Sequence, residues 1–554
     1  MSQHKSSFES SLQSIQFQVI WRRLISIVEE QARILMKTAF SPVVRESGDL
    51  SAALFDPEGR MLAQAITGTP GHVNSTAAAV PHFLKEYPAE VLKPGDHLIT
   101  NDPWLTSGHL HDVTVVSPIF IENTLVALFG CTCHQLDIGG LGQGPDARSV
   151  FEEGLSIPIM KLVKEGEINQ DLLKIIEKNV RTPYEVQGDI LSYVAANETS
   201  GVKLTDMMLE YGLNDLKGIG DEIIERSRAG MLDEIRKLPQ GTTHNTITLD
   251  GYDKPVEIVC ALTIAEDAIN VDFSGSTEAS TKGINLVLNY TQAYANYGIR
   301  CVVGSHIPNN SGSLSPINIS APEGSILNVQ HPWPVCARHI IGQFLPDAVM
   351  GCLAQLIPES VPAEGASSLW GVQMRGGPEV DAASDFKRAH KDTSRYEMLL
   401  FNSGGTGARP NQDGMSATGF PSGVRSTPVE VVENISPVVI WRKELRPGSA
   451  GKGKWRGGLG QIVEIGTIDD SPFMVFAMFD RTVNPAHGRL GGEDGQCGIV
   501  RIKNGSDLQA KGAQVIEPGQ HLEILLPGGG GFGSIEERSA ELHSQDLKDG
   551  LLIT

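Results

Sequence analysis

Side chains that could bind a metal ion gather in two short segments of the chain. His109 and Asp112 are three positions apart, and His134 and Asp137 repeat that spacing. Imidazole nitrogens and carboxylate oxygens suit zinc, manganese or iron, and a catalytic ion needs three or four such ligands and an open position. We therefore expect His109, Asp112 and His134 to be metal ligands, with Asp49 as a further ligand. Asp137 is expected to be a fourth ligand or to fix an imidazole N–H from outside the ligand set.

Simpler interpretations of the same residues exist. A histidine is usually a surface or hydrogen-bonded residue, and Asp112 could cap the start of a strand. His111 is expected to point away from the other histidines. No H-E-x-x-H motif and no thiolate pair at zinc-ribbon spacing sharpens the metal hypothesis, and Cys131 and Cys133 are interpreted as small buried residues on a strand. The spacing therefore leaves the metal a hypothesis and its identity open between zinc, manganese and iron.

A predicted β-hairpin brings the two segments together. Residues 113–120 and 124–132 are rich in β-branched and apolar side chains, and Glu122-Asn123 between them suits a hairpin turn. The outer ends of a hairpin lie side by side, and here those ends carry His109 and His134. Two separate motifs thereby become one expected site.

The rest of the chain predicts helices and strands in several separate groups. Apolar residues at helical spacing favour helices, and alternating β-branched residues favour strands. Residues 360–430 are expected to be rich in loops, and 535–548 to form a helical tail. Helices are expected at 12–40, 72–87, 170–180, 186–196, 202–211, 213–237, 286–303 and 338–355; strands are expected at 50–55 (directly after Asp49), 60–64 and 97–100, and within 243–275 and 460–525.

These elements together predict an α+β, multi-lobed fold with mixed sheets, a helical middle section and a β-rich C-terminal lobe. The expected regions are an N-terminal α/β region with the metal site (1–157), a helical region (158–242), a central α/β region (243–400), and Gly-rich loops with a β-rich lobe (401–554).

Composition narrows the class of protein. A formal net charge of −21 argues against binding nucleic acid through its phosphates. The chain contains no run of about 18 apolar residues, so no membrane-spanning helix is expected. Residues 1–16 lack the pattern of a signal peptide. Seven scattered Cys residues suggest a reduced, cytoplasmic protein.

Five separated blocks, in order, carry a resemblance to a known family. The chain resembles the hydantoinase B/oxoprolinase family, which includes N-methylhydantoinase, 5-oxoprolinase, a caprolactamase β subunit and related acetone and acetophenone carboxylase subunits. The blocks are Asn101-Asp102-Pro103 with Gly108-His109-x-x-Asp112 and His134-x-x-Asp137-Ile138-Gly139-Gly140; Asp272-Phe273-Ser274-Gly275-Ser276 with Gly283-Ile284-Asn285; Gly404-Gly405-x-Gly407-Ala408-Arg409 with Asp413-Gly414; Glu444-Leu445-Arg446-Pro447-Gly448-Ser449-Ala450-Gly451; and Pro527-Gly528-Gly529-Gly530-Gly531-Phe532-Gly533; the turn Asp56-Pro57-Glu58-Gly59-Arg60 is also similar. Thr106-Ser107-Gly108 and Cys133 depart from the family's pattern, which leaves the substrate open.

The resemblance implies an ATP-dependent hydrolase of cyclic amides. A hydantoinase A-like partner subunit would phosphorylate the amide oxygen with ATP, in a heterotetramer or larger assembly. The metal of this subunit would then lower the pKa of bound water. His134 and Asp137 are the expected catalytic residues, with Asp49 as an alternative general base to Asp137. Two alternatives remain, a subunit of an ATP-dependent ketone carboxylase and a non-catalytic scaffold.

The Gly-rich blocks near residues 404–409 and 527–533 do not match a phosphate-binding loop. Neither is followed by the Lys and Ser or Thr of that motif, so tight turns and close packing explain the glycines better. The resemblance implies that the partner subunit handles ATP, so this chain need not bind nucleotide itself. Arg409 or Arg481 could still contact a phosphorylated intermediate.

Overall fold

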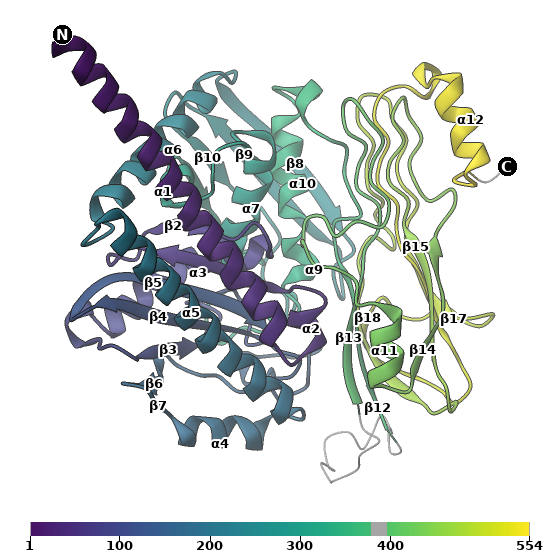
Figure 1. Cartoon of the computed structure of the whole chain (residues 1–554). Helices are drawn as coiled ribbons and strands as arrows, with labels where there is room; N and C mark the ends of the chain where they lie inside the picture. Colours follow the sequence, from purple (N-terminus) through teal and green to yellow (C-terminus); the bar gives the residue numbers. More distant parts are fainter. Residues whose placement is uncertain (1, 378–395, 553–554) are drawn as a thin grey trace.

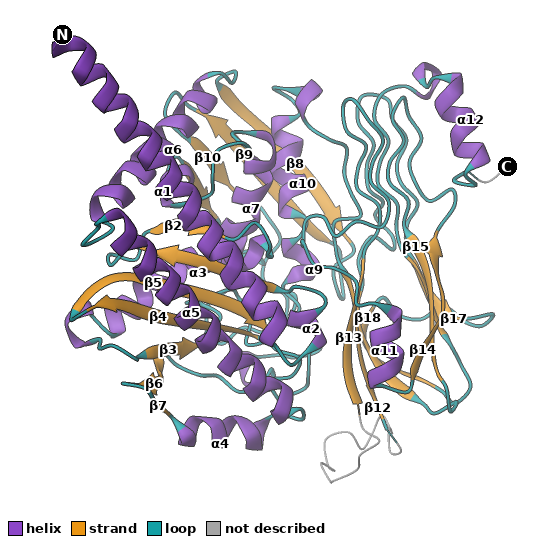
Figure 2. Cartoon of the chain, in the orientation of Figure 1, coloured by secondary structure: helices purple, strands orange, loops and turns teal. Residues whose placement is uncertain are grey.

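The computed structural model describes residues 2–377 and 396–552. Within these ranges the chain forms four β-sheets, with helices packed against the two sheets that come first in the sequence (Figures 1 and 2). The expected multi-lobed α+β fold is confirmed. Among the helices of these ranges, none is long and apolar enough to cross a membrane.

The first sheet contains the hairpin expected from the sequence. Its strands follow the order β2-β1-β5-β4-β3-β6-β7, and all neighbours are antiparallel. Asp112 pairs with His134 at the open end of the hairpin, while Glu122 turns the chain at the other end with a φ of 55°. The strands are β1 (Leu50–Phe55), β2 (Met61–Gln64), β3 (His97–Thr100), β4 (Asp112–Ile121), β5 (Thr124–His134), β6 (Met160–Lys164) and β7 (Glu167–Ile168).

Helices cover both faces of this sheet. Because successive side chains of a strand point to opposite faces, Phe129 packs in the core shared with α1 and α5, whereas Leu128 packs with Phe83 of α3. The N-terminal part of α1 extends away from the sheet (Figure 1). The helices are α1 (Ser2–Thr38), α2 (Pro42–Arg45), α3 (Pro70–Glu86), α4 (Gln170–Asn179), α5 (Pro183–Tyr211) and α6 (Lys217–Arg236).

One continuous helix, α5, replaces two that were expected on either side of residues 197–201. Two residues of that stretch contact the sheet: Asn197 donates a hydrogen bond to Ser117 at 2.9 Å, and a Cβ on Gly201 would come within 2.5 Å of the Ile119 side chain. Contact with the sheet therefore outweighs helix propensity here.

The central sheet follows the order β11-β10-β9-β8, with β10 and β11 parallel. Helix α10 packs on β8 and β9, and α7 packs against both α10 and α3, which joins this region to the first. The expected helix at 338–355 is divided into α9 and α10. The elements are β8 (Gly241–Leu249), β9 (Val256–Ile264), β10 (Ile269–Asp272), β11 (Ile317–Ser320), α7 (Leu288–Val302), α8 (Ser311–Leu314), α9 (His339–Gly342) and α10 (Leu345–Leu353).

Two sheets share one core in the β-rich C-terminal lobe. Their orders are β13-β12-β16-β18 and β14-β15-β19-β17. Strands β12 and β13 occupy a section that was expected to consist mainly of loops; Trp370, Val372 and Met374 of β12 lie in the shared core. The elements are β12 (Trp370–Gly376), β13 (Tyr396–Asn402), β14 (Val438–Leu445), β15 (Gln461–Thr467), β16 (Phe473–Met478), β17 (Ile499–Ile502), β18 (Lys511–Ile516), β19 (Leu522–Leu525), α11 (Val429–Ile435) and α12 (Ala540–Lys548).

The Gly-rich segments run side by side as extended chains next to these sheets (Figure 2). Their backbones bond directly to one another: the N–H of Gly405 bonds to Pro527 O at 3.2 Å, and that of Gly529 to Gly458 O at 3.0 Å. A Cβ on Gly405 would lie 1.8 Å from Gly458 O. Close packing of the backbone therefore requires these glycines, as the sequence suggested.

Candidate metal centre

Three of the expected ligands converge at the open end of the hairpin. Asp112 begins β4, His134 ends β5 and His109 lies in the loop before β4. One side-chain donor atom from each lies within 4.8 Å of the other two, and all three residues are buried. Asp112 Oδ1 lies 2.7 Å from His109 Nε2 and 3.1 Å from His134 Nδ1.

The hydrogen bonds of His109 leave a lone pair facing the carboxylate. His109 Nδ1 lies 2.9 Å from the Cys336 carbonyl, which can only accept, so Nδ1 carries the proton. Burial, and then the Arg338 guanidinium, lower the pKa of His109 to about 3, so the ring is neutral near neutral pH. Nε2 therefore faces Asp112 Oδ1 without a proton and without a hydrogen bond.

His134 approaches Asp112 from the other strand. Its Nδ1 lies 3.1 Å from Asp112 Oδ1, and its Nε2 lies 3.2 Å from the side-chain oxygen of Gln143. Two imidazole nitrogens and one carboxylate oxygen thus meet in a buried space. These are ligand types that a divalent metal takes, and His109 Nε2 has no hydrogen-bond partner, so the residues fit such an ion.

The second carboxylate oxygen of Asp112 is fully engaged elsewhere. Oδ2 lies 2.8 Å from His72 Nε2, and accepts hydrogen bonds from Arg338 at 2.5 Å and Ser107 at 2.6 Å. Burial disfavours the charge, but the surrounding positive groups and donors hold the pKa of Asp112 well below its usual range. Oδ1 is therefore the atom left to face the two histidines.

His72 and Arg338 were not found by the sequence reasoning. His72 lies near the start of α3, and Arg338 lies more than 200 positions beyond Asp112. Neither forms part of a local motif with the hairpin, so only the packing of α3 and segment 335–338 against the sheet brings them to the site.

Asp49 reaches the cavity as expected, although it is outside the three-residue group. It precedes β1, which pairs with β5, and its backbone carbonyl accepts the N–H of His134 at 3.1 Å. Its carboxylate accepts a hydrogen bond from Thr69 at 3.0 Å and lies 3.7 Å from His72 Nδ1. Asp49 lines the same cavity as His109 and His134.

Asp137 is not brought to the other ligands, contrary to the expectation from its spacing. One of its oxygens accepts hydrogen bonds from Gly139 N–H at 3.0 Å and from the Arg181 guanidinium at 2.7 Å, and the other accepts the Arg181 backbone N–H. The chain turns after β5, and the carboxylate faces the start of α5. These contacts fix a loop at the start of a helix.

His111 was expected to point away from the histidines, but it lies beside them. Its ring stacks on that of His134 with 5.5 Å between centroids and 12° between planes, and it lies 5.5 Å from the ring of His109. Burial, and then the two neighbouring histidines, lower its pKa well below the usual value. His111 therefore forms a neutral wall of the site.

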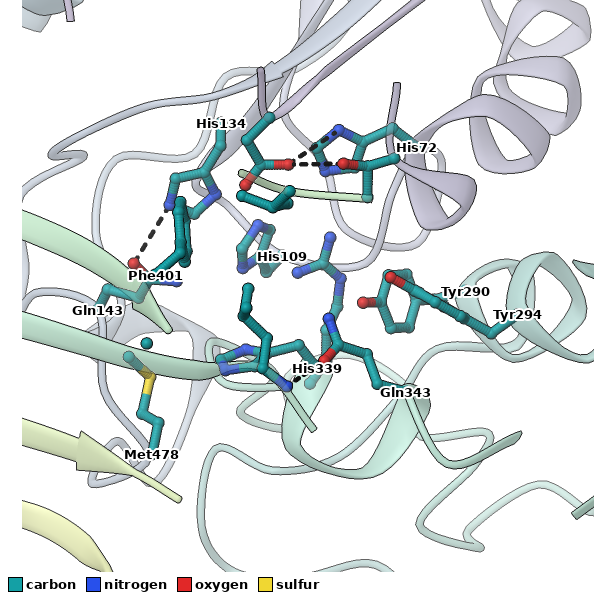
Figure 3. A pocket seen from close by; sticks show the side chains of 16 residues that line it. His72, His109, His134, Gln143, Tyr290, Tyr294, His339, Gln343, Phe401 and Met478 are labelled. Atoms are coloured by element: carbon teal, nitrogen blue, oxygen red, sulfur yellow. Dashed lines mark hydrogen bonds and ion pairs between the residues drawn. The ribbon is translucent and has the colours of Figure 1, made fainter. Parts of the chain in front are cut away.

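Residues from three parts of the chain line the cavity beside this group (Figure 3). Arg338 places its guanidinium 4.0 Å from the centre of the Tyr290 ring. Neither Arg409 nor Arg481, which were expected near a phosphorylated intermediate, lines it; Arg481 is instead buried against Glu364 at 2.9 Å. The remaining lining comes from the central region (Tyr294, His339, Gln343) and the C-terminal lobe (Leu369, Gly371, Phe401, Val424, Met478).

The fold and the site define a multi-lobed α+β protein with buried side chains able to hold a metal ion. The chain belongs to the Hydantoinase B/oxoprolinase family, whose model matches residues 13–535.

Two relatives match nearly their whole length. An uncharacterized protein of Methanocaldococcus jannaschii is 29% identical, over 97% of this chain and 94% of its own. A protein provisionally named as a D-/L-hydantoinase subunit, from a Pseudomonas species, is 29% identical over 97% of this chain and 93% of its own.

A third relative is a longer protein. A 5-oxoprolinase of Pestalotiopsis fici is 28% identical over 94% of this chain, which corresponds to only 41% of that longer protein.

Two solved structures share the fold. The ATP-dependent caprolactamase of Pseudomonas jessenii superposes with a TM-score of 0.88 at 24% identity, covering 98% of this chain and 94% of the matched chain. A nucleotide-free acetone carboxylase superposes with a TM-score of 0.85 at 20% identity, covering 98% and 78%. One relative is thus named as a hydantoinase subunit, and the two structures that share the fold are named for ATP-dependent reactions.

Proposed function

We propose that this chain is the metal-dependent catalytic subunit of an ATP-dependent cyclic-amide hydrolase. A hydantoinase A-like partner would phosphorylate the amide oxygen of a hydantoin, an oxoproline or a larger lactam, within a heterotetramer or larger cytoplasmic assembly. The single observation that carries the proposal is the buried group of His109, Asp112 and His134, whose side-chain donor atoms all lie within 4.8 Å of one another. The family and the names of its members support the substrate class.

His109 Nε2, Asp112 Oδ1 and His134 Nδ1 would hold the ion, with Asp49 as the further ligand from the same cavity. The ligand set suits zinc or manganese, and iron is possible. When bound, such an ion polarises a carbonyl or phosphoryl oxygen and lowers the pKa of bound water. Asp137 is committed to Arg181, so we assign it no part in this chemistry.

Arg338 supplies the positive charge that a phosphorylated intermediate would need. Its guanidinium is buried, lines the cavity and is held by Asp112 and by the Ser107 carbonyl at 2.5 Å. Arginine binds phosphoryl oxygens through paired N–H groups. We propose that Arg338 takes the role first considered for Arg409 and Arg481.

The proposal is tested by purifying the chain together with its partner subunit. Metal content is measured by mass spectrometry, and cyclic amides are screened for ATP-dependent hydrolysis. His109→Ala is expected to lose both metal and turnover, whereas the exposed His82→Ala on α3 should keep both. Metal content and turnover that stay at the wild-type level in His109→Ala would exclude the proposed site.

A ketone carboxylase subunit is the second candidate, because the fold also superposes on acetone carboxylase. The chain covers a larger share of the caprolactamase chain, 94% against 78%, which favours the hydrolase. Incorporation of labelled carbon from bicarbonate into a ketone substrate would show that the complex is a carboxylase. A complex that is active while this chain is metal-free would instead identify a scaffold.

A further inference from the structure

We propose that Glu153 is a positioning residue of the metal site, which acts through residues 335–338 to hold His109 and Arg338 in place. The inference deepens the proposed function, since it presumes that the site binds a metal. Glu153 is fully buried, lies outside the cavity lining and touches none of the three ligands. Its effect on the site must therefore pass through the backbone that it contacts.

The Glu153 carboxylate holds two consecutive backbone N–H groups. Its Oε1 accepts from Val335 at 2.5 Å and from Cys336 at 2.8 Å. Its Oε2 has no hydrogen-bond partner, and no ion pair involving Glu153 occurs among the described side chains. A buried carboxylate without a cation is unfavourable unless its hydrogen bonds compensate. Within residues 2–377 and 396–552, the two backbone contacts are thus the only hydrogen bonds of this side chain.

The held segment delivers two contacts to the metal site. The N–H of Ala337 bonds to Gly283 O at 2.7 Å, which fixes the peptide plane that contains the Cys336 carbonyl. That carbonyl accepts a hydrogen bond from His109 Nδ1–H, with 2.9 Å between the nitrogen and the oxygen. One residue further along, Arg338 reaches Asp112 Oδ2 at 2.5 Å. Glu153 on one side and Gly283 on the other therefore set the position of both contacts.

Holding the Cys336 carbonyl has a chemical consequence for His109. The hydrogen bond to Nδ1 fixes the tautomer and the orientation of the ring, so the lone pair of Nε2 points at the metal position. If segment 335–336 shifts, the ring can rotate or change tautomer, although every ligand is still present. Loss of such partners typically weakens metal binding by about 10–100-fold.

The chain offers a matched control. Asp189 is also fully buried, accepts two consecutive backbone N–H groups, from Phe40 at 2.6 Å and Ser41 at 3.0 Å, and leaves its second oxygen without a partner. These hydrogen bonds lead to the start of α2 and not to His109. Replacing Asp189 therefore reports the effect of losing such a carboxylate without losing the contact to His109.

The experiment titrates the purified full-length chain with cobalt alone and records the visible absorption spectrum. Glu153→Ala is expected to raise the cobalt dissociation constant by about 10–100-fold and to change the spectrum. Glu153→Gln should stay close to wild type, because its amide oxygen can accept both N–H groups. Asp189→Ala should lower the melting temperature and leave the cobalt affinity and spectrum unchanged. If Glu153→Ala does not fold, Glu153→Asp, which withdraws the oxygen from both N–H groups, replaces it.

Wild-type affinity and spectrum in the folded Glu153→Ala or Glu153→Asp chain would overturn the inference. So would an equal loss of affinity in Asp189→Ala, because general loosening would then explain the effect. A wild-type chain that binds no cobalt would overturn the proposed function itself, so the two failures are distinguishable.

Discussion

The buried contact between Asp112 and Arg338 predicts a strong energetic coupling between the two residues. The pair is 2.5 Å apart, with side-chain exposures of 0% and 4%. Asp112→Ala leaves the buried guanidinium without its counter-charge, and breaking such a pair costs about 3–5 kcal/mol. In Asp112→Ala/Arg338→Met neither charge remains, so the double variant should be only slightly less stable than either single variant. The coupling energy is then on the order of 3 kcal/mol.

The assay measures unfolding of the metal-free chain by guanidinium chloride in a buffer that contains a chelator. Circular dichroism and tryptophan fluorescence must give coincident transitions before free energies are compared, because a chain of several lobes can unfold in more than one step. The Arg338→Met variant also loses the contact to the Ser107 carbonyl at 2.5 Å. That loss is present in both variants that contain Arg338→Met, so it cancels from the coupling energy.

Metal supplies a second measurement on the same variants. With zinc at about 1,000 times its dissociation constant, wild type should gain about 4.1 kcal/mol of stability. The two variants that lack the Asp112 carboxylate should gain little, since a ligand is missing. Free-energy losses of Asp112→Ala and Arg338→Met that simply add would refute the coupling. An equal gain from zinc in wild type and Asp112→Ala would refute the ligand role of Asp112.

Three further results are expected. Gln143→Leu removes the hydrogen-bond partner of His134 Nε2 at 3.2 Å and should weaken metal binding by about 10–100-fold, measured by competition with a chelating dye; unchanged affinity would contradict a positioning role for Gln143. Asp137→Asn should lower stability by about 1.5–3 kcal/mol through its contacts to Arg181 but keep the metal, and loss of metal would restore Asp137 as a ligand. Burial raises the pKa of Glu153 to about 8 from 4.5, so the folded chain binds the extra proton and loses stability as pH rises through that window. Glu153→Gln should remove this pH dependence, so its free energy of unfolding should rise relative to wild type by up to about 1.4 kcal/mol per pH unit. Parallel curves of stability against pH for the two proteins would contradict the raised pKa of Glu153.

The sequence predicted the parts of the site that depend on local structure. The strands of the hairpin and their turn follow from residue type over a short span, so the meeting of His109, Asp112 and His134 could be anticipated. Asp49 followed from its place before an adjacent strand. The β-rich C-terminal lobe and most helices were likewise visible as periodic patterns.

The features that the sequence concealed depend on long-range packing. Equal i+3 spacing made Asp137 resemble Asp112, but the paths of the chain before β4 and after β5 differ, and only the structure shows the contact to Arg181. His72 and Arg338 come from helix α3 and from a segment far along the chain. Propensity also failed at Asn197 and Gly201, which fit the sheet surface because they are polar or small.

The cavity draws its walls from regions that fold into different sheets. The predicted metal ligands all lie in the first region, while Phe401 and Met478 of the C-terminal lobe also line the cavity. Substitutions at Phe401 or Met478 would therefore reshape the cavity while leaving His109, Asp112 and His134 in place.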